Sequence, residues 1–253
     1  MKILPVEGLP EFGDGMDIVS EIESVTTVKD GDVVCVASTI VSKVEGRTAD
    51  LEDYQVGERA EAIAERRTSA DGTGPNPRLV EAVLSESEEV LIESPFLLSV
   101  THFGHVGVNA GIDRSNTGPA DLLLLPEDPG ASADRIRRRA SADVSVIVTD
   151  TSGRPFRRGQ RGVAIGWSGI PAGRDYRGET DRDGHTLEVT VESVVDELAA
   201  ASNLLQGEGD DGTPVVVIRG FEFGDHGETD SLFRDPDTDY VRAALREWTI
   251  QTS

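Results

Sequence analysis

The spacing of apolar and polar residues changes repeatedly along the chain, from the pattern of a strand to that of a helix and back. Continuous apolar runs rich in β-branched residues predict strands buried on both faces. Where glycines flank or interrupt such a run, we expect close backbone neighbours. The segments expected as strands are Val33–Ser42, Leu97–Phe103, Val106–Ala110, Val144–Val148, Gly162–Gly166 and Val215–Ile218.

Helices are expected where apolar residues recur at intervals of three and four. Pro77 stands where a proline suits the first turn of a helix, and Ser132 is expected to cap the helix that carries Arg135, Arg137, Arg138 and Arg139. In the longest helix the core stripe is Val191, Val194, Val195, Leu198 and Leu205. The expected helices are Glu58–Arg67, Pro77–Leu84, the one at Ser132, Thr190–Leu205 and Asp239–Trp248.

Strands and helices alternate throughout, without an internal repeat or a low-complexity linker. This alternation predicts the α+β class, with mixed sheets and helices, although the order of strands in the sheets cannot be read from the sequence. With 253 residues, of which 37% are hydrophobic, the chain is long enough to bury a substantial core.

Charge changes the picture of the surface. The chain has 47 acidic residues against 24 basic ones, a net charge of -23, and its only lysines are Lys2, Lys29 and Lys43. This charge argues against binding to nucleic acid or to an anionic membrane. The acidic residues are spread along the chain, which favours a surface adapted to molar salt, where charges are screened within about 3 Å.

No segment is apolar enough to span a membrane, and the first residues become acidic too early for a secretory signal. We therefore expect a soluble, cytoplasmic protein. Cys35 is the only cysteine, which excludes an intramolecular disulfide and a zinc site built from cysteines. Its position inside a predicted strand favours a core residue over a nucleophile.

Three segments rich in acidic, amide or glycine residues follow apolar elements and are expected to be loops: Asn109–Asn116, Asp150–Gly153 and Gly207–Gly212. Carboxylate and hydroxyl oxygens are the ligands that Mg²⁺ and Mn²⁺ prefer. If the three segments converge, Asp113, Asp150, Thr151 and Glu208 supply such ligands. The alternative is ordinary turn chemistry, because Asp, Asn and Gly are frequent turn residues.

The segment Gly207–Gly212 also matches the spacing G-x-G-x-x-G. It follows a predicted helix and leads into a strand, whereas the dinucleotide fingerprint follows a strand and opens a helix. Its acidic residues would also repel a bare phosphate. We therefore exclude a Rossmann core, and the chain contains no P-loop sequence.

Two groups of cations are candidates for anion binding. Arg154, Arg157, Arg158 and Arg161 follow the Asp150 segment, and they either bind a phosphate or carboxylate or balance nearby acids. Lys43, just past a predicted strand, is either a phosphate contact or a surface lysine. The pair of histidines spaced His102-x-x-His105 is expected to belong to a hairpin turn and not to a metal site.

Four ordered motifs together resemble the coenzyme F420 gamma-glutamyl ligase family: Ser38–Gly46, Asn109–Asn116, Asp150–Arg154 and Asn203–Gly209. The resemblance extends from Leu4 to about Glu222. It implies a single α+β domain over residues 1–253, made of two interwoven parts, and a homodimer. The acidic, lysine-poor composition looks like that of a haloarchaeal member.

The family's activity implies GTP-dependent addition of L-glutamate to coenzyme F420-0, followed by a second glutamate through a gamma linkage. The resemblance also implies two divalent cations, Mg²⁺ or Mn²⁺, and K⁺ as a further ion. Asp113 and Asp150 resemble the ligands of one divalent cation, through which they act in catalysis, and Thr151 and Glu208 resemble those of the other. The implied nucleotide contacts are Leu9, Pro10, Glu11, Phe12, Ser38, Thr39, Lys43, Asn116, Gln206, Gly207, Glu208, Gly209, Asp210, Asp211, Gly212 and Thr213.

The chain departs from the family at Glu208, where many members carry Gln, and the segment Leu9–Phe12 is poorly distinctive. The implied chemistry is transfer of the γ-phosphoryl group to a carboxylate, followed by attack of the glutamate amine on the acyl phosphate. Two alternatives predict other behaviour. A metal-dependent nucleotide hydrolase would turn over GTP without an acceptor, and a non-catalytic acidic binding protein would bind no nucleotide.

Overall fold

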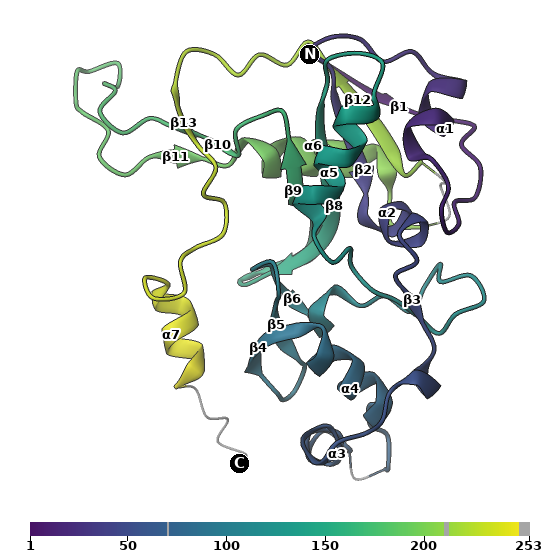
Figure 1. Ribbon diagram of the computed structural model, residues 1–253. Coiled ribbons are helices and arrows are strands. Elements are labelled where there is room, and N and C mark those ends of the chain that lie inside the picture. Colours follow the sequence, from purple (N-terminus) through teal and green to yellow (C-terminus); the bar gives the residue numbers. More distant parts are fainter. Residues whose placement is uncertain (70, 210–212, 248–253) are drawn as a thin grey trace. The chain divides into compact units, whose positions relative to one another are not determined.

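A computed structural model describes residues 1–69, 71–209 and 213–247 of the chain, which forms two compact units (Figure 1). The first unit comprises Met1–Gly46 and Asp128–Leu232, and the second comprises Arg47–Glu127 and the chain from Phe233 onward. Each unit is thus assembled from two separate stretches of sequence. Helices and mixed sheets confirm the predicted α+β class.

The first unit is built around a five-stranded sheet. One pairing, between β2 and β8, is parallel, and the other pairings are antiparallel, so the order is not that of a Rossmann sheet. In spatial order the strands are β1 (Lys2–Pro5), β12 (Val215–Arg219), β2 (Val33–Ala37), β8 (Ser145–Arg154) and β9 (Arg157–Ser168).

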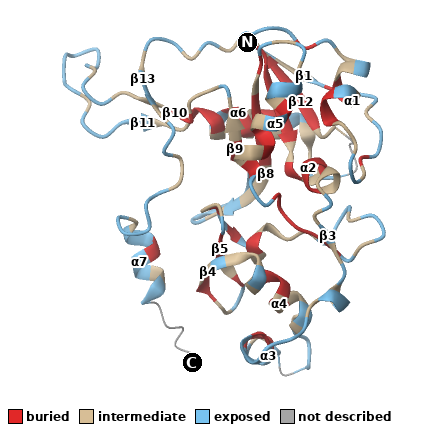
Figure 2. Cartoon of the chain, in the orientation of Figure 1, coloured by how far each residue is buried: buried red, intermediate tan, exposed pale blue. Residues whose placement is uncertain are grey.

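Helices cover both faces of this sheet. On one face, α6 (Val194–Gln206) packs its buried Val195 and Leu198 against Cys35 and Ile147. On the other face, α1 (Ile18–Val25) and α5 (Pro129–Arg139) pack near Val34 and Val146. Burial on two faces explains why the central strands are continuous apolar runs and do not alternate (Figure 2).

A smaller sheet completes the first unit. It joins β10 (Gly173–Asp175) with β11 (Val191–Glu192) on one side and β13 (Gly227–Thr229) on the other. Arg174 of its central strand donates hydrogen bonds to the carbonyls of Glu222 and Phe223 and pairs with Glu192.

The second unit contains the other predicted strands and helices. Its sheet consists of β4 (Ser87–Ile92), β5 (Leu98–Thr101) and β6 (Val106–Val108), and β3 (Thr48–Ala49) pairs with β7 (Leu122–Leu123). The remaining elements are η1 (Leu51–Asp53), α3 (Glu58–Arg66), α4 (Pro77–Ser85), η2 (Asn109–Gly111) and α7 (Tyr240–Arg246). Among the described residues, every helix is too short or too polar to span a bilayer.

The prediction of a strand over Val33–Ser42 was wrong in its second half. Strand β2 ends at Ala37, and α2 covers Ser38–Val44. The neighbouring β12 begins at Val215, and the Ala37 amide donates to the Pro214 carbonyl, so the ladder on that side stops there. Packing then favours a helix, which buries Ile40 and Val41 despite their strand propensity.

Two predictions about helix ends were also wrong. The long helix begins at Val194 and not at Thr190, because Val191 pairs in β11 and is exposed. Leu205, placed in the core stripe, is also exposed. Helix α5 starts at Pro129 with Asp128 as its N-cap, so Ser132 lies inside the helix and donates to Glu45.

Candidate active site

The site begins where two neighbouring strands end together. Because β2 and β8 are parallel, with Ala37 opposite Thr149, their carboxyl ends meet at one edge of the sheet. The next residue of each chain segment is therefore adjacent. The Ser38 hydroxyl donates a 3.2 Å hydrogen bond to the Asp150 carboxylate. The predicted nucleotide contact Ser38 and the predicted metal ligand Asp150 thus lie side by side.

The segment Asp150–Gly153 was expected to be a loop, and that prediction was wrong. Strand β8 continues to Arg154, because β9 pairs with it to that point. A loop would leave these side chains free to turn, whereas a strand fixes them on alternate faces. Asp150 and Ser152 therefore lie on one face of the hairpin, and Thr149 and Thr151 lie on the other.

The face that carries Thr149 and Thr151 is turned toward α6. The Thr149 hydroxyl lies 3.3 Å from the side-chain oxygen of Gln206. Gly162 stands opposite Thr151 in the ladder, and a Cβ atom there would come within 2.4 Å of the Ala199 carbonyl oxygen. This close approach brings the last turns of α6 against the strand pair.

Glu208 lies on the same side as Thr151. Helix α6 ends at Gly207, whose φ of 71° is in the left-handed region that favours glycine. The next residue, Glu208, accepts a 2.9 Å hydrogen bond from Asn203. The Cβ of Asn203 would be 2.8 Å from a Cβ added at Gly162. Thr151 and Glu208 are thus connected through Gly162 and Asn203.

The oxygen donors at this edge suit a hard cation. The donors are the carboxylates of Asp150 and Glu208 and the hydroxyl of Thr151. All are oxygen ligands, without sulfur or imidazole among them, which matches the preference of Mg²⁺ and Mn²⁺. Asp150 lies on the opposite face of β8 from Thr151 and Glu208, so the two faces would serve separate cations. Asp150 and Thr151 are half-buried and Glu208 is exposed, so water and a ligand can complete each coordination shell. The donor set fits the divalent cations that the resemblance implies.

Other predicted nucleotide contacts surround this edge. Gln206, at the end of α6, donates a hydrogen bond to the carbonyl of Pro214. Pro214 stands between the predicted contact Thr213 and the start of β12. Thr39 lies in the first turn of α2, and Lys43 lies in its last turn and not beyond a strand. Lys43 forms an ion pair with Glu11.

The segment Leu9–Phe12 divides between surface and core. Pro10 and Glu11 are exposed, Leu9 is half-buried and Phe12 is buried. A nucleotide contact by this segment stays a prediction. Asp210, Asp211 and Gly212 lie outside the described residues, and Gly209 is the last described residue before them.

Asp113 and Asn116 belong to the second unit. Backbone hydrogen bonds of 2.9 Å join Asp113 to Leu123, and the Asp113 carboxylate accepts 2.8 Å hydrogen bonds from the amide and hydroxyl of Ser115. Asn116 has a φ of 53°, a left-handed conformation that Asn tolerates. The pairing of Asp113 with Asp150 on one metal joins residues of different units and stays a prediction.

The two remaining candidates from the sequence have structural roles. Burial raises the pKa of the Cys35 thiol to about 12, and the side chain is fully buried, which confirms a core residue. His102 lies in the turn between β5 and β6 and contacts the Ser85 carbonyl, and buried His105 stacks on Phe103. Both histidines thus have the expected hairpin role.

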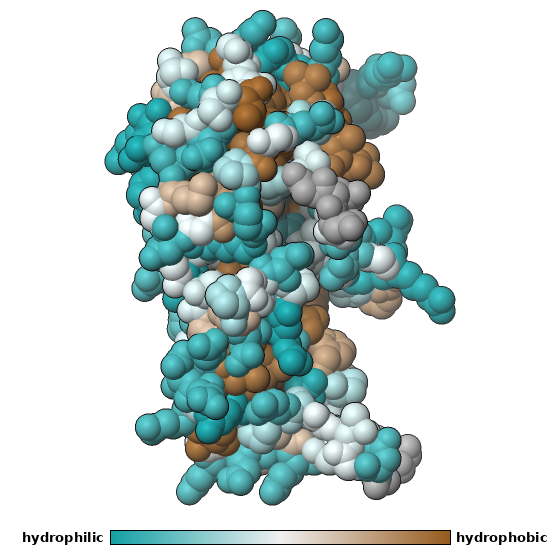
Figure 3. All heavy atoms as spheres, turned by 90° about the vertical axis from the view of Figure 1, so that its right-hand side faces the viewer, coloured by the Kyte–Doolittle hydropathy of each residue, from teal (hydrophilic) through white to brown (hydrophobic). Residues whose placement is uncertain are grey.

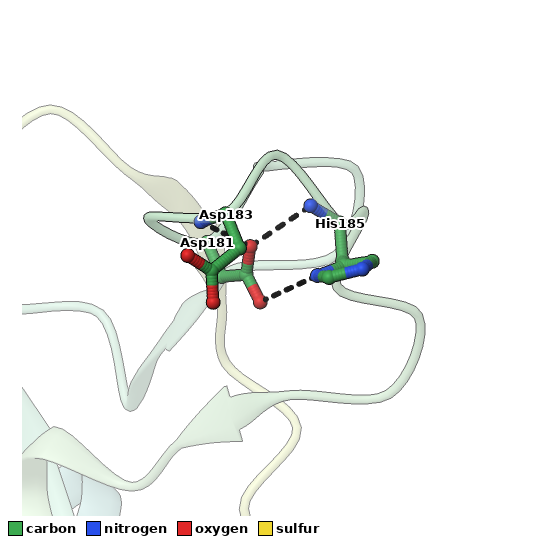
Figure 4. A group of neighbouring side chains, drawn as sticks. All are labelled: Asp181, Asp183 and His185. Carbon is green, nitrogen blue, oxygen red and sulfur yellow. Dashed lines mark hydrogen bonds and ion pairs between the residues drawn. The ribbon is translucent and has the colours of Figure 1, made fainter.

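One acidic group escaped the sequence analysis. Asp181, Asp183 and His185 gather in the loop between β10 and β11 (Figure 4). The Asp181 carboxylate accepts hydrogen bonds from the amides of Asp183 and His185, which also lower its pKa. These are the hydrogen bonds of a tight turn, and a turn accounts for the cluster.

Comparison with known proteins identifies the family. The model of the F420-0:gamma-glutamyl ligase family matches residues 8–220. A coenzyme F420:L-glutamate ligase of Halobacterium salinarum is 61% identical over 250 residues, which cover 99% of each chain. Proteins of the same name from Natronomonas pharaonis and Archaeoglobus fulgidus are 61% and 48% identical and are covered over 98% of their length. The chain belongs to the F420-0:gamma-glutamyl ligase family.

Proposed function

We propose that this chain is a ligase of coenzyme F420 biosynthesis, which joins L-glutamate to coenzyme F420-0 at the expense of GTP and then adds a second glutamate through a gamma linkage. The observation that carries the proposal is the edge of the sheet where Ser38 meets Asp150 and where Thr151 and Glu208 share a face. Membership of the ligase family supports it.

The reaction requires activation of a carboxylate, because an amine does not displace an oxide from a carboxylate ion. In the proposed sequence an acceptor carboxylate oxygen attacks the γ-phosphorus of GTP, and GDP leaves. The glutamate amine then attacks the acyl phosphate carbon. The amide bond forms, the carbon–oxygen bond to phosphate breaks, and inorganic phosphate leaves with one oxygen of the original carboxylate.

The task of the protein is to position the reactants and to offset their charge. Asp150, with Asp113, would hold one Mg²⁺ or Mn²⁺, and Thr151 and Glu208 would hold another. Such ions, when bound, would supply positive charge against phosphate oxygens. The Ser38 hydroxyl fixes the orientation of the Asp150 carboxylate through the 3.2 Å hydrogen bond between them.

Lys43 and Gln206 have complementary roles in this proposal. Lys43 lies in the last turn of α2, and its ammonium is balanced by Glu11 in this structure. Exchange of Glu11 for a phosphate would place that cation on the nucleotide. Gln206 joins Thr149 to the carbonyl of Pro214 and so keeps the end of α6 against the sheet. K⁺ as a further ion and a homodimer belong to the same proposal, on the strength of the family resemblance.

The test is mass spectrometry of coenzyme F420-0 incubated with the protein, GTP, L-glutamate and Mn²⁺ in molar KCl. We expect mass gains of one and two glutamyl units, absent when GTP is omitted. GTP turnover that is independent of F420-0 and glutamate would instead identify a nucleotide hydrolase. Absence of metal-dependent nucleotide binding by the folded protein would indicate a non-catalytic role.

A further inference from the structure

The β8–β9 hairpin extends beyond the sheet that holds its base. Strand β2 pairs with β8 only as far as Thr149, whereas β9 pairs with β8 to Arg154. Residues 152–161 therefore form a two-stranded projection, which we call the arginine arm (Figure 1). Its charged side chains are Arg154, Arg157, Arg158 and Arg161, and the last three are exposed.

These arginines are notable in a chain of net charge -23. Among the described residues, none of the four forms an ion pair, and Arg154 donates a 3.5 Å hydrogen bond to the Gly159 carbonyl. Ion pairs do occupy Arg47, Arg59, Arg66, Arg135, Arg137, Arg138, Arg139, Arg174, Arg177, Arg219, Arg242 and Arg246. Four neighbouring arginines whose guanidinium groups pair with no described carboxylate indicate a binding site for an anion from outside the chain.

The tip of the arm adds an aromatic side chain. Phe156 is fully exposed, and its φ of 65° lies in the left-handed region. This conformation costs a phenylalanine about 1 kcal/mol, and exposure of the ring forgoes the gain from burial. Both costs are borne at the same residue, between Arg154 and Arg157. An exposed ring among guanidinium groups suits a flat aromatic ligand that carries negative charge.

The register of the hairpin sets the order of these groups. Arg161 is opposite Ser152, two residues from Asp150 and on the same face, and Arg154 is opposite Arg157 near the tip. At about 3.3 Å per residue, the strand from Asp150 to Arg154 is about 13 Å long, and Phe156 follows in the turn. The arginine side chains thus lie along the hairpin between the edge at Asp150 and the exposed ring of Phe156.

We propose that the arginine arm binds the acceptor in an extended conformation. The arginines pair with the anionic groups of its chain, and Phe156 stacks on its deazaflavin ring, while the reacting carboxylate reaches the edge at Asp150. This inference rests on the proposed function, because it takes the acceptor from that proposal. At molar salt, charges act within about 3 Å, so the arm works by direct contact and not by long-range steering.

The test measures binding without catalysis. F420-0 is titrated with the full-length protein in molar KCl, without GTP or glutamate, and the fluorescence anisotropy of the deazaflavin is followed. We expect Arg161→Gln, Arg158→Gln and Phe156→Ala each to raise the Kd for F420-0 by about tenfold or more. The matched control is Arg182→Gln, an exposed arginine of the β10–β11 loop.

Three further readouts separate the explanations. Thermal melting tests whether the arm variants are folded as stably as wild type, and we expect their melting temperatures to equal that of wild type. A rise in the KM for GTP with an unchanged Kd for F420-0 would assign the arm to the nucleotide and overturn the proposal. Loss of the wild-type oligomeric state in the arm variants would assign the arm to a second copy, with the same consequence.

Failure of the two proposals can be told apart. If wild type does not bind F420-0, the proposed function is wrong and the arm proposal with it. If wild type binds F420-0 and the arm variants bind it equally well, the arm proposal alone is wrong.

Discussion

Ser38 and Asp150 are hydrogen-bonded over 3.2 Å although 112 positions separate them in the sequence. The contact exists because the parallel strands β2 and β8 end at the same edge of the sheet, with each residue directly following a paired position. A hydroxyl that donates to a carboxylate restricts its rotation, as an outer-shell partner does for a metal ligand. The relationship predicts that Ser38 acts on catalysis through Asp150.

Removal of this hydroxyl is expected to lower glutamyl transfer without unfolding the protein. Ser38→Ala should lower kcat/KM by about tenfold, and Asp150→Asn, which keeps the hydrogen-bond acceptor but loses the charge, by about a hundredfold or more. Excess Mn²⁺ should partly restore Ser38→Ala. The control is Asp183→Asn in the exposed loop. Equal activity of Asp150→Asn and wild type would remove Asp150 from the mechanism.

Much of the fold was predictable, because continuous β-branched runs formed the central strands. The failures have a common cause. A continuous apolar run has no periodicity that separates strand from helix, and the end of β2 at Ala37 is set by Pro214 of a distant segment. Likewise, Val191 lies in strand β11 because β11 pairs with Arg174 and Asp175 of β10. Such non-local pairing leaves no trace in a local pattern.

The contact between α6 and the hairpin should be intolerant of a single methyl group. Gly162→Ala would place a Cβ 2.4 Å from the Ala199 carbonyl oxygen and 2.8 Å from Asn203, so helix and strand must separate. We expect a loss of unfolding free energy of about 2 kcal/mol and a weaker metal affinity, because Asn203 holds Glu208.

The matched control is Gly153→Ala, since nothing lies within 4 Å of a Cβ at Gly153. Urea unfolding and Mn²⁺ titration measure the two effects. A Gly162→Ala protein with the stability of the Gly153→Ala protein would contradict the packing described at this glycine.

Asp32 predicts a pH-dependent contribution to stability. Burial acts to raise its pKa, but hydrogen bonds from Arg219 and the Lys29 amide outweigh burial, so the pKa lies below its ordinary value of 3.8. A lowered pKa in the folded state stabilises the protein above pH 3.8, and this contribution is lost as the pH falls below that value.

We therefore expect Asp32→Asn to lower the free energy of unfolding by about 3 kcal/mol near neutral pH, since Arg219 loses its partner. The difference between variant and wild type should shrink as the pH falls below 3.8. Urea unfolding at a series of pH values measures it. A difference that stays constant down to the lowest pH of the folded protein would refute the linkage.

In the second unit, Glu89 of β4 connects this strand to α7 through ion pairs. It pairs with Arg242 and Arg246, and the hydrogen bond from Arg246 is the main cause that lowers the pKa of Glu89 to about 2. Glu89→Gln should destabilise the protein by about 2 kcal/mol and increase hydrogen exchange in α7 first. Glu88→Gln, at an exposed neighbour, is the control. Unchanged exchange in α7 would show that other contacts hold the helix.

The acidic surface predicts that stability depends on salt. The face seen in Figure 3 is largely hydrophilic, and the net charge of the chain is -23. Screening should reduce the repulsion among carboxylates, so the melting temperature should rise from low to molar KCl. Differential scanning calorimetry over a KCl series measures the rise. A melting temperature independent of KCl would contradict adaptation to molar salt.

For the site, the sequence supplied the chemistry of Asp150, Thr151 and Glu208, but not their arrangement. Spacing alone could not choose between metal ligands and turn residues. The structure adds that Thr151 and Glu208 share the face of α6, and that Asp150 lies on the opposite face beside Ser38. That separation depends on β8 continuing as a strand through Thr151, which its local sequence did not indicate.

The central claim is that an acceptor carboxylate is activated by phosphoryl transfer, and isotope transfer tests it most directly. F420-0 labelled with ¹⁸O in the reacting carboxyl group is incubated with the protein, GTP, L-glutamate and Mn²⁺ in molar KCl. We predict one ¹⁸O in the inorganic phosphate for each first glutamate joined to labelled F420-0, whereas a second glutamate, joined to the unlabelled γ-carboxylate of the first, releases unlabelled phosphate. A product with one glutamate whose formation releases only unlabelled phosphate would contradict the claim.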